Sequence, residues 1–379
     1  MNILQVIPSL AIVGGAEVLV VKIAIFLKEL GHNVTILCFA AKENQLVELL
    51  RKNNIEIVIV PKKMNLRSKK MNLRYVFYSP YNFIFTNKYI KNHNFDIVHA
   101  HLFPARLCMA MVRLIYKNKI PLVATEHSTY DTRRRKIIFK LLNKISYSQF
   151  DKIVAVSQST KDALVKWIPN TNRRCLVIYN GINNKEFDTI KKEKDKKQEL
   201  VVMLVGNFTH AKGHDILLRA FALTKNMKLY LVGEGKLQDE IKELARKLNI
   251  ADRVYFLGNR QDVASLLASV DIYVQSSLWE GFGIAVVEAM AVGLPIIVSD
   301  VPSLSEVVGE AGMTFPCGNV NKLADTLMLL ASNKELRDKL SILAKKRSLL
   351  FSLEKTVKEH LSLYNTMLKE KAGFIESVQ

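Results

Sequence analysis

Residues 276–300 hold a loop, a short apolar helix and a strand in quick succession, and this order constrains the fold more than any other stretch. The polar, glycine-bearing loop gives way to an apolar run, and the β-branched segment 296–299 follows it. The start of the chain has a related order, with apolar strands at 3–7 and 34–39 on either side of a helical pattern at 16–30. Such β-loop-α-β units predict an α/β fold with parallel sheets.

Two carboxylates lie in the first of these stretches, Glu280 in the loop and Glu288 in the apolar helix. A carboxylate in such a helix must find hydrogen-bond donors, and these could come from a ligand or from a nearby cation in the core. The helix start at 283–285 should present backbone N–H groups and the positive end of a helix dipole, which suit an anion such as a diphosphate. Glu288 would then lie one turn further along, within reach of hydroxyls attached to that anion.

The positive charge of the chain is concentrated in its first half. The 379 residues suffice for two domains and carry a net charge of +20. Residues 1–190 hold 29 Lys and Arg against 12 Asp and Glu, net +17, whereas residues 191–379 hold 26 against 23, net +3. The first half is therefore expected to face an anionic partner, although a lysine-rich coding bias would explain the total charge without one.

The four cysteines are far apart and show no paired ligand spacing, so the sequence predicts neither a zinc site nor a disulfide framework, and a reducing cytoplasm fits. The first ten residues resemble a strand rather than a signal peptide. No apolar run reaches the roughly 18 residues of a membrane span. Any association with a membrane is therefore expected to be peripheral.

Polar residues follow the strands of the first half where a ligand could bind. Gly14 and Gly15, in the sequence GGAE, precede the first helix and would let backbone approach a phosphate, although paired glycines are often only a turn. His99 ends the strand predicted at 97–99 and His101 follows it, and His127 follows the strand predicted at 121–125. All three are expected at the carboxyl edge of the predicted sheet. His99 and His101 could either touch a substrate or cap the strand.

A duplicated basic segment, KKMNLR at 62–67 and again at 69–74, shows no amphipathic stripe and is interpreted as a basic loop. Seven aromatic residues follow between 75 and 89. Basic residues beside Tyr and Phe suit a membrane interface, and an ordinary packed helix is the alternative for the aromatics.

The second half restarts the strand pattern after a charged linker at 190–198. Lys212 and Gly213 precede a helix there, so a cation and a close backbone approach are predicted to converge on one anion site.

The spacing of Glu280 and Glu288, with GFGIAVV between them, resembles the E-x7-E element of the retaining glycosyltransferases of family 4. The resemblance extends from GGAE to about residue 300. It implies the α/β GT-B fold, with two Rossmann-like doubly wound domains facing a central cleft. The domains would be an acceptor-side domain at 1–188, completed by a crossover helix at about 351–379, and a nucleotide-sugar-binding domain at 189–350.

The resemblance also assigns roles to residues. Glu280 and His127 would lie by the donor sugar, Lys212 would stabilise the leaving diphosphate, and Glu288 would bind the ribose hydroxyls. Family members usually have Arg where this chain has Asn207, so one expected phosphate-clamping cation is missing. The resemblance implies ten further donor-binding positions, which would lie in the cleft, beside the nucleotide base or at the diphosphate. They are Gly14, Gly15, Asn207, Gly258, Asn259, Arg260, Gly281, Phe282, Gly283 and Ile284.

The sequence thus predicts a retaining glycosyltransferase that moves a sugar from a nucleotide-sugar, with UDP expected, to a hydroxyl of a glycan or lipid-linked glycan in cell-surface polysaccharide synthesis. It contains no D-x-D, so neither a metal nor another cofactor is expected. The predicted location is the cytoplasm, on the anionic inner face of the membrane. The rivals are a sugar-nucleotide epimerase on the same fold and a nucleic-acid-binding protein, although no nucleic-acid-binding motif is present and no nucleic-acid partner is expected.

Overall fold

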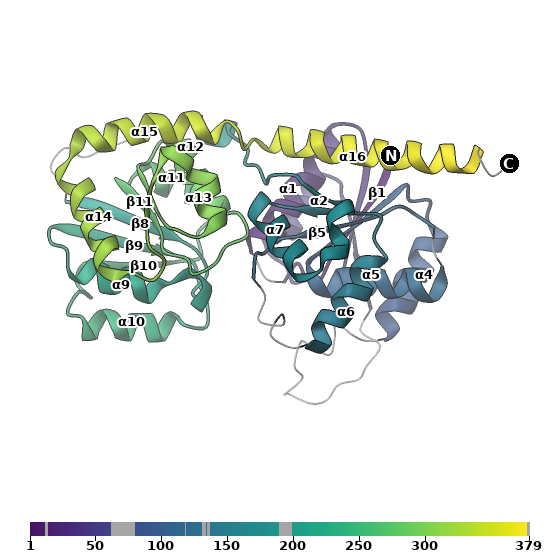
Figure 1. The fold of residues 1–379 in the computed structure, drawn as a ribbon, viewed down its shortest axis with the longest axis horizontal. Coiled ribbons are helices and arrows are strands. Elements are labelled where there is room, and N and C mark those ends of the chain that lie inside the picture. The colour runs from purple at the N-terminus through teal and green to yellow at the C-terminus, as the bar shows by residue number, and fades with distance from the viewer. Residues whose placement is uncertain are drawn as a thin grey trace. The chain divides into compact units, whose positions relative to one another are not determined.

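The structure is a computed structural model that describes residues 1–11, 14–61, 80–117, 119–130, 134, 137–188 and 199–376. The chain divides into two units, one formed by 1–179 with 354–379 and the other by 180–353 (Figure 1). The corresponding boundaries predicted from the sequence are 188 and about 351. Both KKMNLR repeats and the linker predicted at 190–198 lie outside the described residues.

The first unit is built on a seven-stranded parallel sheet with the order β3-β2-β1-β4-β5-β6-β7. Its strands are β1 Asn2–Ile7, β2 Asn33–Cys38, β3 Glu56–Ile59, β4 Ile97–His101, β5 Leu122–Glu126, β6 Lys152–Ala155 and β7 Cys175–Val177. The winding reverses between β1 and β4, which are neighbours in the sheet although β2 and β3 separate them in sequence. Ligands of open parallel sheets bind beyond the carboxyl ends of the strands at such a switch point.

The helices of the first unit are α1 Gly15–Glu29, α2 Gln45–Lys52, α4 Pro80–Asn92, α5 Leu102–Tyr116, α6 Ile137–Ser148, α7 Gln158–Trp167 and α16 Leu353–Glu376. The last helix, yellow in Figure 1, returns to this unit after the chain has passed through the other one. Its Tyr364 hydroxyl lies 2.6 Å from Nδ1 of His99 on β4, and its Thr356 hydroxyl donates to the carbonyl of Tyr179 at 2.8 Å.

Four of the aromatic residues that the sequence associated with a membrane interface lie on α4. Tyr81, Phe83, Phe85 and Tyr89 are half-buried and pack against the hydrophobic core of the first unit. These four residues therefore fit the packed helix, which was the alternative to a membrane interface.

The second unit has a six-stranded parallel sheet with the order β10-β9-β8-β11-β12-β13. Its strands are β8 Leu200–Val205, β9 Met227–Val232, β10 Val254–Gly258, β11 Ile272–Gln275, β12 Ile296–Ser299 and β13 Met313–Phe315. Its helices are α8 Lys185–Asp188, α9 His214–Ala222, α10 Gln238–Lys247, α11 Val263–Ala268, α12 Ile284–Val292, α13 Pro302–Val308, α14 Val320–Ser332 and α15 Lys334–Ser348. The winding reverses between β8 and β11, so this unit has its own switch point. The loop, helix and strand predicted within 276–300 are the connection from β11 through α12 to β12.

Candidate active site

An ion pair joins two of the predicted site residues at the switch point of the second unit. Lys212 ends a short 3-10 helix at His210–Lys212, after β8, and Glu280 lies in the loop between β11 and α12. Lys212 Nζ is 2.5 Å from Glu280 Oε2, and the two side chains are 24% and 17% exposed. The fold therefore brings a cation and a carboxylate together at the carboxyl ends of adjacent strands.

Hydrogen bonds join the two loops that carry this pair. The Ser276 hydroxyl donates to the carbonyl of Gly213 at 2.9 Å, and the backbone N–H of Leu278 donates to the carbonyl of Ala211 at 2.8 Å. Gly213 has φ of +59°, and a Cβ there would lie 2.2 Å from the carbonyl oxygen of Ser276. Only glycine suits both the left-handed backbone and this approach.

A buried chain of hydrogen bonds leads from the core to Glu280. The Tyr273 hydroxyl donates to Gln275 Oε1 at 2.7 Å, Gln275 Nε2 donates to Ser277 Oγ at 2.9 Å, and Ser277 Oγ donates to Glu280 Oε2 at 3.3 Å. Burial raises the pKa of Tyr273 far above its ordinary value, and the charges of Glu288 and Glu280 raise it further. The Tyr273 hydroxyl therefore stays protonated and donates to Gln275 Oε1.

These three residues were not predicted from the sequence. They occupy buried positions of β11 and the loop after it, where apolar residues are the rule. The sequence pattern that could have identified them is a side chain with a polar group at every second position, 273, 275 and 277, just before the Glu280 loop.

The loop that carries Glu280 ends at the start of α12. Gly283 precedes the helix with φ of +97°, and its side-chain-free position leaves α12 without a side-chain cap. Phe282 is buried, and its ring meets the Phe351 ring edge-on at a centroid distance of 5.4 Å. Glu288 is half-buried, one turn after Ile284, on the same helix.

The remaining donor-binding candidates of this unit end β8 and β10. Asn207 is exposed in the loop after β8, and the aliphatic part of Lys212 packs 3.4 Å from where a Cβ of Gly206 would be. Gly258 ends β10 with φ of +67°, and its carbonyl accepts from the N–H of Gly233 at 2.8 Å. Asn259 and Arg260 follow on the surface. Arg260 makes two hydrogen bonds to Asp262, at 2.7 and 2.8 Å.

The candidates of the first unit lie around its own switch point. His127 follows β5, and its Nε2 is 3.3 Å from Nδ1 of His101. Nε2 of His101 is 2.6 Å from Oε1 of Gln5 on β1. Burial lowers the pKa of His127 to about 4, with the nearby His360 adding to the shift, so the imidazole is neutral at neutral pH.

His99 and His101 are buried and hydrogen-bonded within the first unit, which favours the structural alternative for both. Gly14 precedes α1 and Gly15 is its first residue. A Cβ on Gly14 would lie 2.6 Å from the Glu17 carboxylate, so the side chain of Glu17 folds back over the helix start.

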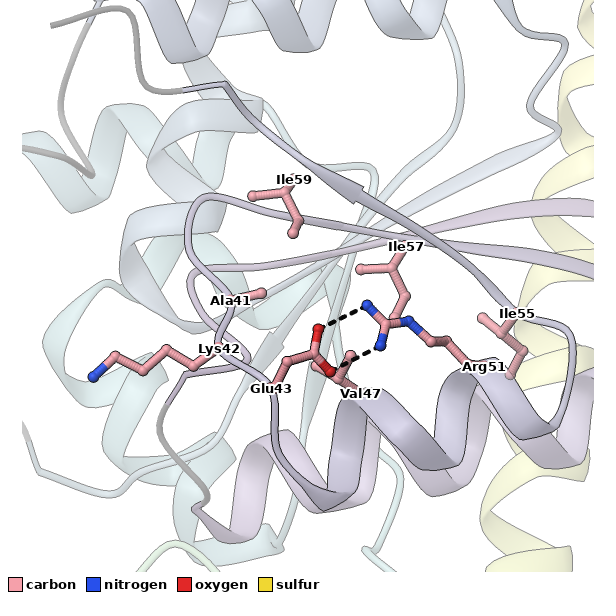
Figure 2. A pocket seen from close by; sticks show the side chains of 8 residues that line it. All are labelled: Ala41, Lys42, Glu43, Val47, Arg51, Ile55, Ile57 and Ile59. Carbon is pink, nitrogen blue, oxygen red and sulfur yellow. Dashed lines mark hydrogen bonds and ion pairs between the residues drawn. The ribbon is translucent and has the colours of Figure 1, made fainter.

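A separate pocket of about 230 Å³ lies between α2 and the edge strand β3 (Figure 2). Aliphatic side chains of Val47, Ile55 and Ile57 line it, and the ion pair of Glu43 and Arg51 crosses it at 2.8 Å. It contains none of the predicted site residues.

Among the described residues, no three His, Cys, Asp or Glu side chains gather as a metal site. The helices in the described part of the chain include none with the length and hydropathy of a membrane span.

Two family models match successive parts of the chain. The model described as Glycosyltransferase Family 4 matches residues 13–186, and the one described as Glycosyl transferases group 1 matches residues 185–347. Both predicted halves of the chain are thus matched separately.

Individual proteins are also similar. An uncharacterized glycosyltransferase of Methanocaldococcus jannaschii is 33% identical over 276 residues, covering 71% of this chain and 74% of that protein. The N-acetylgalactosamine-N,N'-diacetylbacillosaminyl-diphospho-undecaprenol 4-alpha-N-acetylgalactosaminyltransferase of Campylobacter jejuni is 26% identical over 262 residues, covering 67% and 72%. The crystal structure of Anabaena HepE in complex with UDP and glucose superposes with a TM-score of 0.80 at 20% identity, covering 96% and 99%, which shows a shared fold.

Proposed function

The chain belongs to glycosyltransferase family 4, and on that premise we propose that it is a retaining enzyme that transfers a sugar from a UDP-sugar to a hydroxyl of a lipid-linked glycan. The observation that carries the proposal is the pair of Lys212 and Glu280 at the switch point beside the start of α12. A fixed cation and a helix start suit the diphosphate of a sugar nucleotide.

The donor would be held by the second unit. Its diphosphate would meet Lys212 and the backbone N–H groups at the start of α12, and its ribose hydroxyls would donate to Glu288. Gly258, Asn259 and Arg260 would border the base. UDP is proposed as the nucleotide because the similar HepE structure was solved with UDP and glucose.

Transfer would proceed on one face of the sugar. The bond between the anomeric carbon and the diphosphate oxygen breaks, the acceptor oxygen forms the new bond on the same face, and the acceptor proton passes to the departing phosphate oxygen. Lys212 would stabilise the charge that grows on the diphosphate, and His127 and Glu280 would border the donor sugar. This scheme needs no resident metal.

The acceptor is proposed to be lipid-linked. The similar Campylobacter jejuni protein is named for a diphospho-undecaprenol acceptor, and the first half of this chain has a net charge of +17. An anionic membrane surface would attract that charge, and the enzyme would work peripherally on the cytoplasmic leaflet.

A donor screen tests the proposal. The full chain is incubated with UDP-, GDP- and ADP-sugars, with and without a glycan acceptor, and nuclear magnetic resonance reports the anomeric configuration of the product. We expect acceptor-dependent consumption of a UDP-sugar with retained configuration. Conversion of the donor without acceptor into an epimer would identify an epimerase instead, and DNA binding without any nucleotide-sugar binding would indicate a nucleic-acid-binding protein.

A further inference from the structure

Helix α6 of the first unit buries its polar side and exposes its apolar side. Its buried side chains are Asn143, Ser146 and Tyr147, all of them polar or carrying a hydroxyl. Five large aliphatic side chains of the same helix are instead exposed to solvent: Ile137 by 87%, Ile138 by 56%, Leu141 by 55%, Leu142 by 37% and Ile145 by 42%. A surface helix of a globular protein normally buries its apolar face, so this helix presents to its surroundings what it would ordinarily hide.

The buried charge of Arg106 explains the orientation. Arg106 lies on α5 and is buried, and its guanidinium donates to Asn143 Oδ1 and to the hydroxyl of Tyr147. It also donates to Glu126 Oε2 at 3.0 Å, and its Cζ lies 3.7 Å from the centre of the Tyr147 ring. Turning the apolar face of α6 inward would take Asn143 and Tyr147 away from this buried charge, which is unfavourable.

The exposed aliphatic residues form one continuous face. Positions 137, 138, 141, 142 and 145 follow the spacing that places side chains together on one side of a helix. Lys140 and Lys144, also exposed, lie one turn apart at the margin of this face. The segment 137–148 contains no Asp or Glu, and the sequence RRRK at 133–136 precedes it directly. Figure 1 shows α6 beside α5 at the periphery of its unit.

We propose that this outward face of α6 docks onto an anionic phospholipid surface. Ile137, Ile138, Leu141, Leu142 and Ile145 lie in the boundary between headgroups and acyl chains, and Lys140 and Lys144 contact lipid phosphates. A basic amphipathic helix with its apolar face free has the chemistry of an interfacial anchor. A second copy of the chain fits less well, because pairing the faces would bring like-charged lysines together. The inference rests on the proposed function only in that a lipid-linked acceptor would be met at the same surface.

Vesicle binding of the full chain tests the inference. The variant Ile138→Gln/Leu141→Gln/Ile145→Gln removes apolar side chains that are exposed, so thermal unfolding should be unchanged. The matched control, Met328→Gln/Leu329→Gln/Ile342→Gln, changes three exposed apolar residues of the second unit. With vesicles of equal parts phosphatidylcholine and phosphatidylglycerol, we expect the α6 variant to bind about tenfold or more weakly than the parent and the control to bind like the parent.

A second variant separates charge from apolar contact. Lys140→Gln/Lys144→Gln should weaken binding to the anionic vesicles and reduce their advantage over pure phosphatidylcholine vesicles. UDP calorimetry on every variant reports the donor site alone. If neither the parent nor any variant binds UDP, the proposed function is wrong, and the vesicle result still tests the inference about α6.

Two outcomes would overturn the inference. One is equal vesicle binding by the parent and the α6 triple variant, or no binding by the parent. The other is a dimer of the parent in light scattering that the triple variant abolishes while neither protein binds vesicles, which would make a second copy the occupant of this face.

Discussion

At the scale of single residues, the ammonium of Lys212 is oriented before any donor binds. Glu280 holds it at 2.5 Å, and the buried chain from Tyr273 through Gln275 and Ser277 restrains Glu280 in turn. Asn207, at the position where the family resemblance implies an arginine, is exposed and uncharged. Under the proposed function, the leaving diphosphate would therefore depend on Lys212 more than it would in a site with two cations.

Lys212→Ala is expected to lower kcat by about 10²–10³-fold with a smaller change in KM, because the negative charge on the diphosphate grows in the transition state. Steady-state kinetics with the UDP-sugar that the screen identifies measure the change. Lys247→Ala, an exposed lysine of the same unit, is the control. Adding Asn207→Arg to Lys212→Ala should restore part of kcat, and an unchanged kcat in the single variant would contradict the role.

Glu288→Gln is expected to weaken UDP binding by about 1.5–3 kcal/mol, because it removes a charged acceptor for the ribose hydroxyls. Isothermal titration calorimetry measures the loss. The effect should be much smaller for a nucleotide analogue that lacks both ribose hydroxyls, and equal UDP affinities of parent and variant would show that Glu288 does not hold the ribose.

Lys212, Glu280 and Glu288 could be selected from the sequence. Lys212 precedes a helix, Glu288 is a charge within an apolar helix, and Glu280 has the E-x7-E spacing to Glu288. The ion pair of Lys212 with Glu280 could not be found in this way. These residues lie 68 positions apart, and only the pairing of β8 with β11 brings their loops together. Gln275 and Ser277 were missed for the same reason, because their hydrogen bonds depend on where the folded loop places Glu280.

At the scale of secondary-structure elements, the site depends on how closely two loops approach. The loop after β8 and the loop after β11 are joined by the hydrogen bonds of Ser276 and Leu278, and Gly213 permits the approach.

Gly213→Ala should destabilise the second unit by about 1–3 kcal/mol or more, because its φ of +59° is unfavourable for alanine and the added Cβ would collide with the Ser276 carbonyl. Gly318→Ala in the same unit is the matched control, since φ there is +80° and no atom lies within 4 Å of the added Cβ. Urea unfolding should show a clearly larger loss for the first variant. Equal losses would mean that the backbone conformation alone, and not the contact between the loops, requires glycine at 213.

The orientation of α6 shows where element-level prediction from sequence ends. In a helix, the spacing of Ile138, Leu141 and Ile145 places them on one face, and all three are exposed. Pattern alone would point that face at the core, whereas Arg106 on another helix recruits Asn143 and Tyr147 instead. By contrast, the helix predicted at 16–30 is α1 at Gly15–Glu29, because its apolar spacing and the glycine that ends it are local signals.

At the scale of the whole molecule, helix α16 brings the end of the chain back to the first unit, where it contacts a buried group of histidines. His360 and Tyr364 of α16 lie against His99 on β4, and His101 and His127 complete the group. Histidines in a strand-end pattern could be recognised in the sequence, but His360 could not be added to them, because it lies more than 200 residues further along in a helix without any motif.

This group should make folding pH-dependent. Burial lowers the pKa of His127 and of His360 to about 4, and it lowers those of His99 and His101 well below the ordinary 6.5. The histidines lower one another's pKa, and Gln5, Thr125 and Tyr364 are their uncharged partners. Because the unfolded chain binds protons first as the pH falls, the stabilisation is complete above about 6.5 and is lost progressively toward about 4.

His360→Gln should therefore flatten the pH dependence of stability. Each titrating histidine contributes up to about 1.4 kcal/mol per pH unit within that window, and glutamine cannot titrate although its amide can still donate toward the carbonyl of Thr356. Urea unfolding at several pH values between about 7 and 4.5 gives the slope of the unfolding free energy against pH. Subtracting the free energy that the variant loses at pH 7 from the difference at each pH separates the packing defect from the titration. His93→Gln, at an exposed histidine of the same unit, should keep the parent slope. An identical slope in parent and His360→Gln would mean that this histidine is already protonated in the folded chain, or that the group opens to solvent before the unit unfolds.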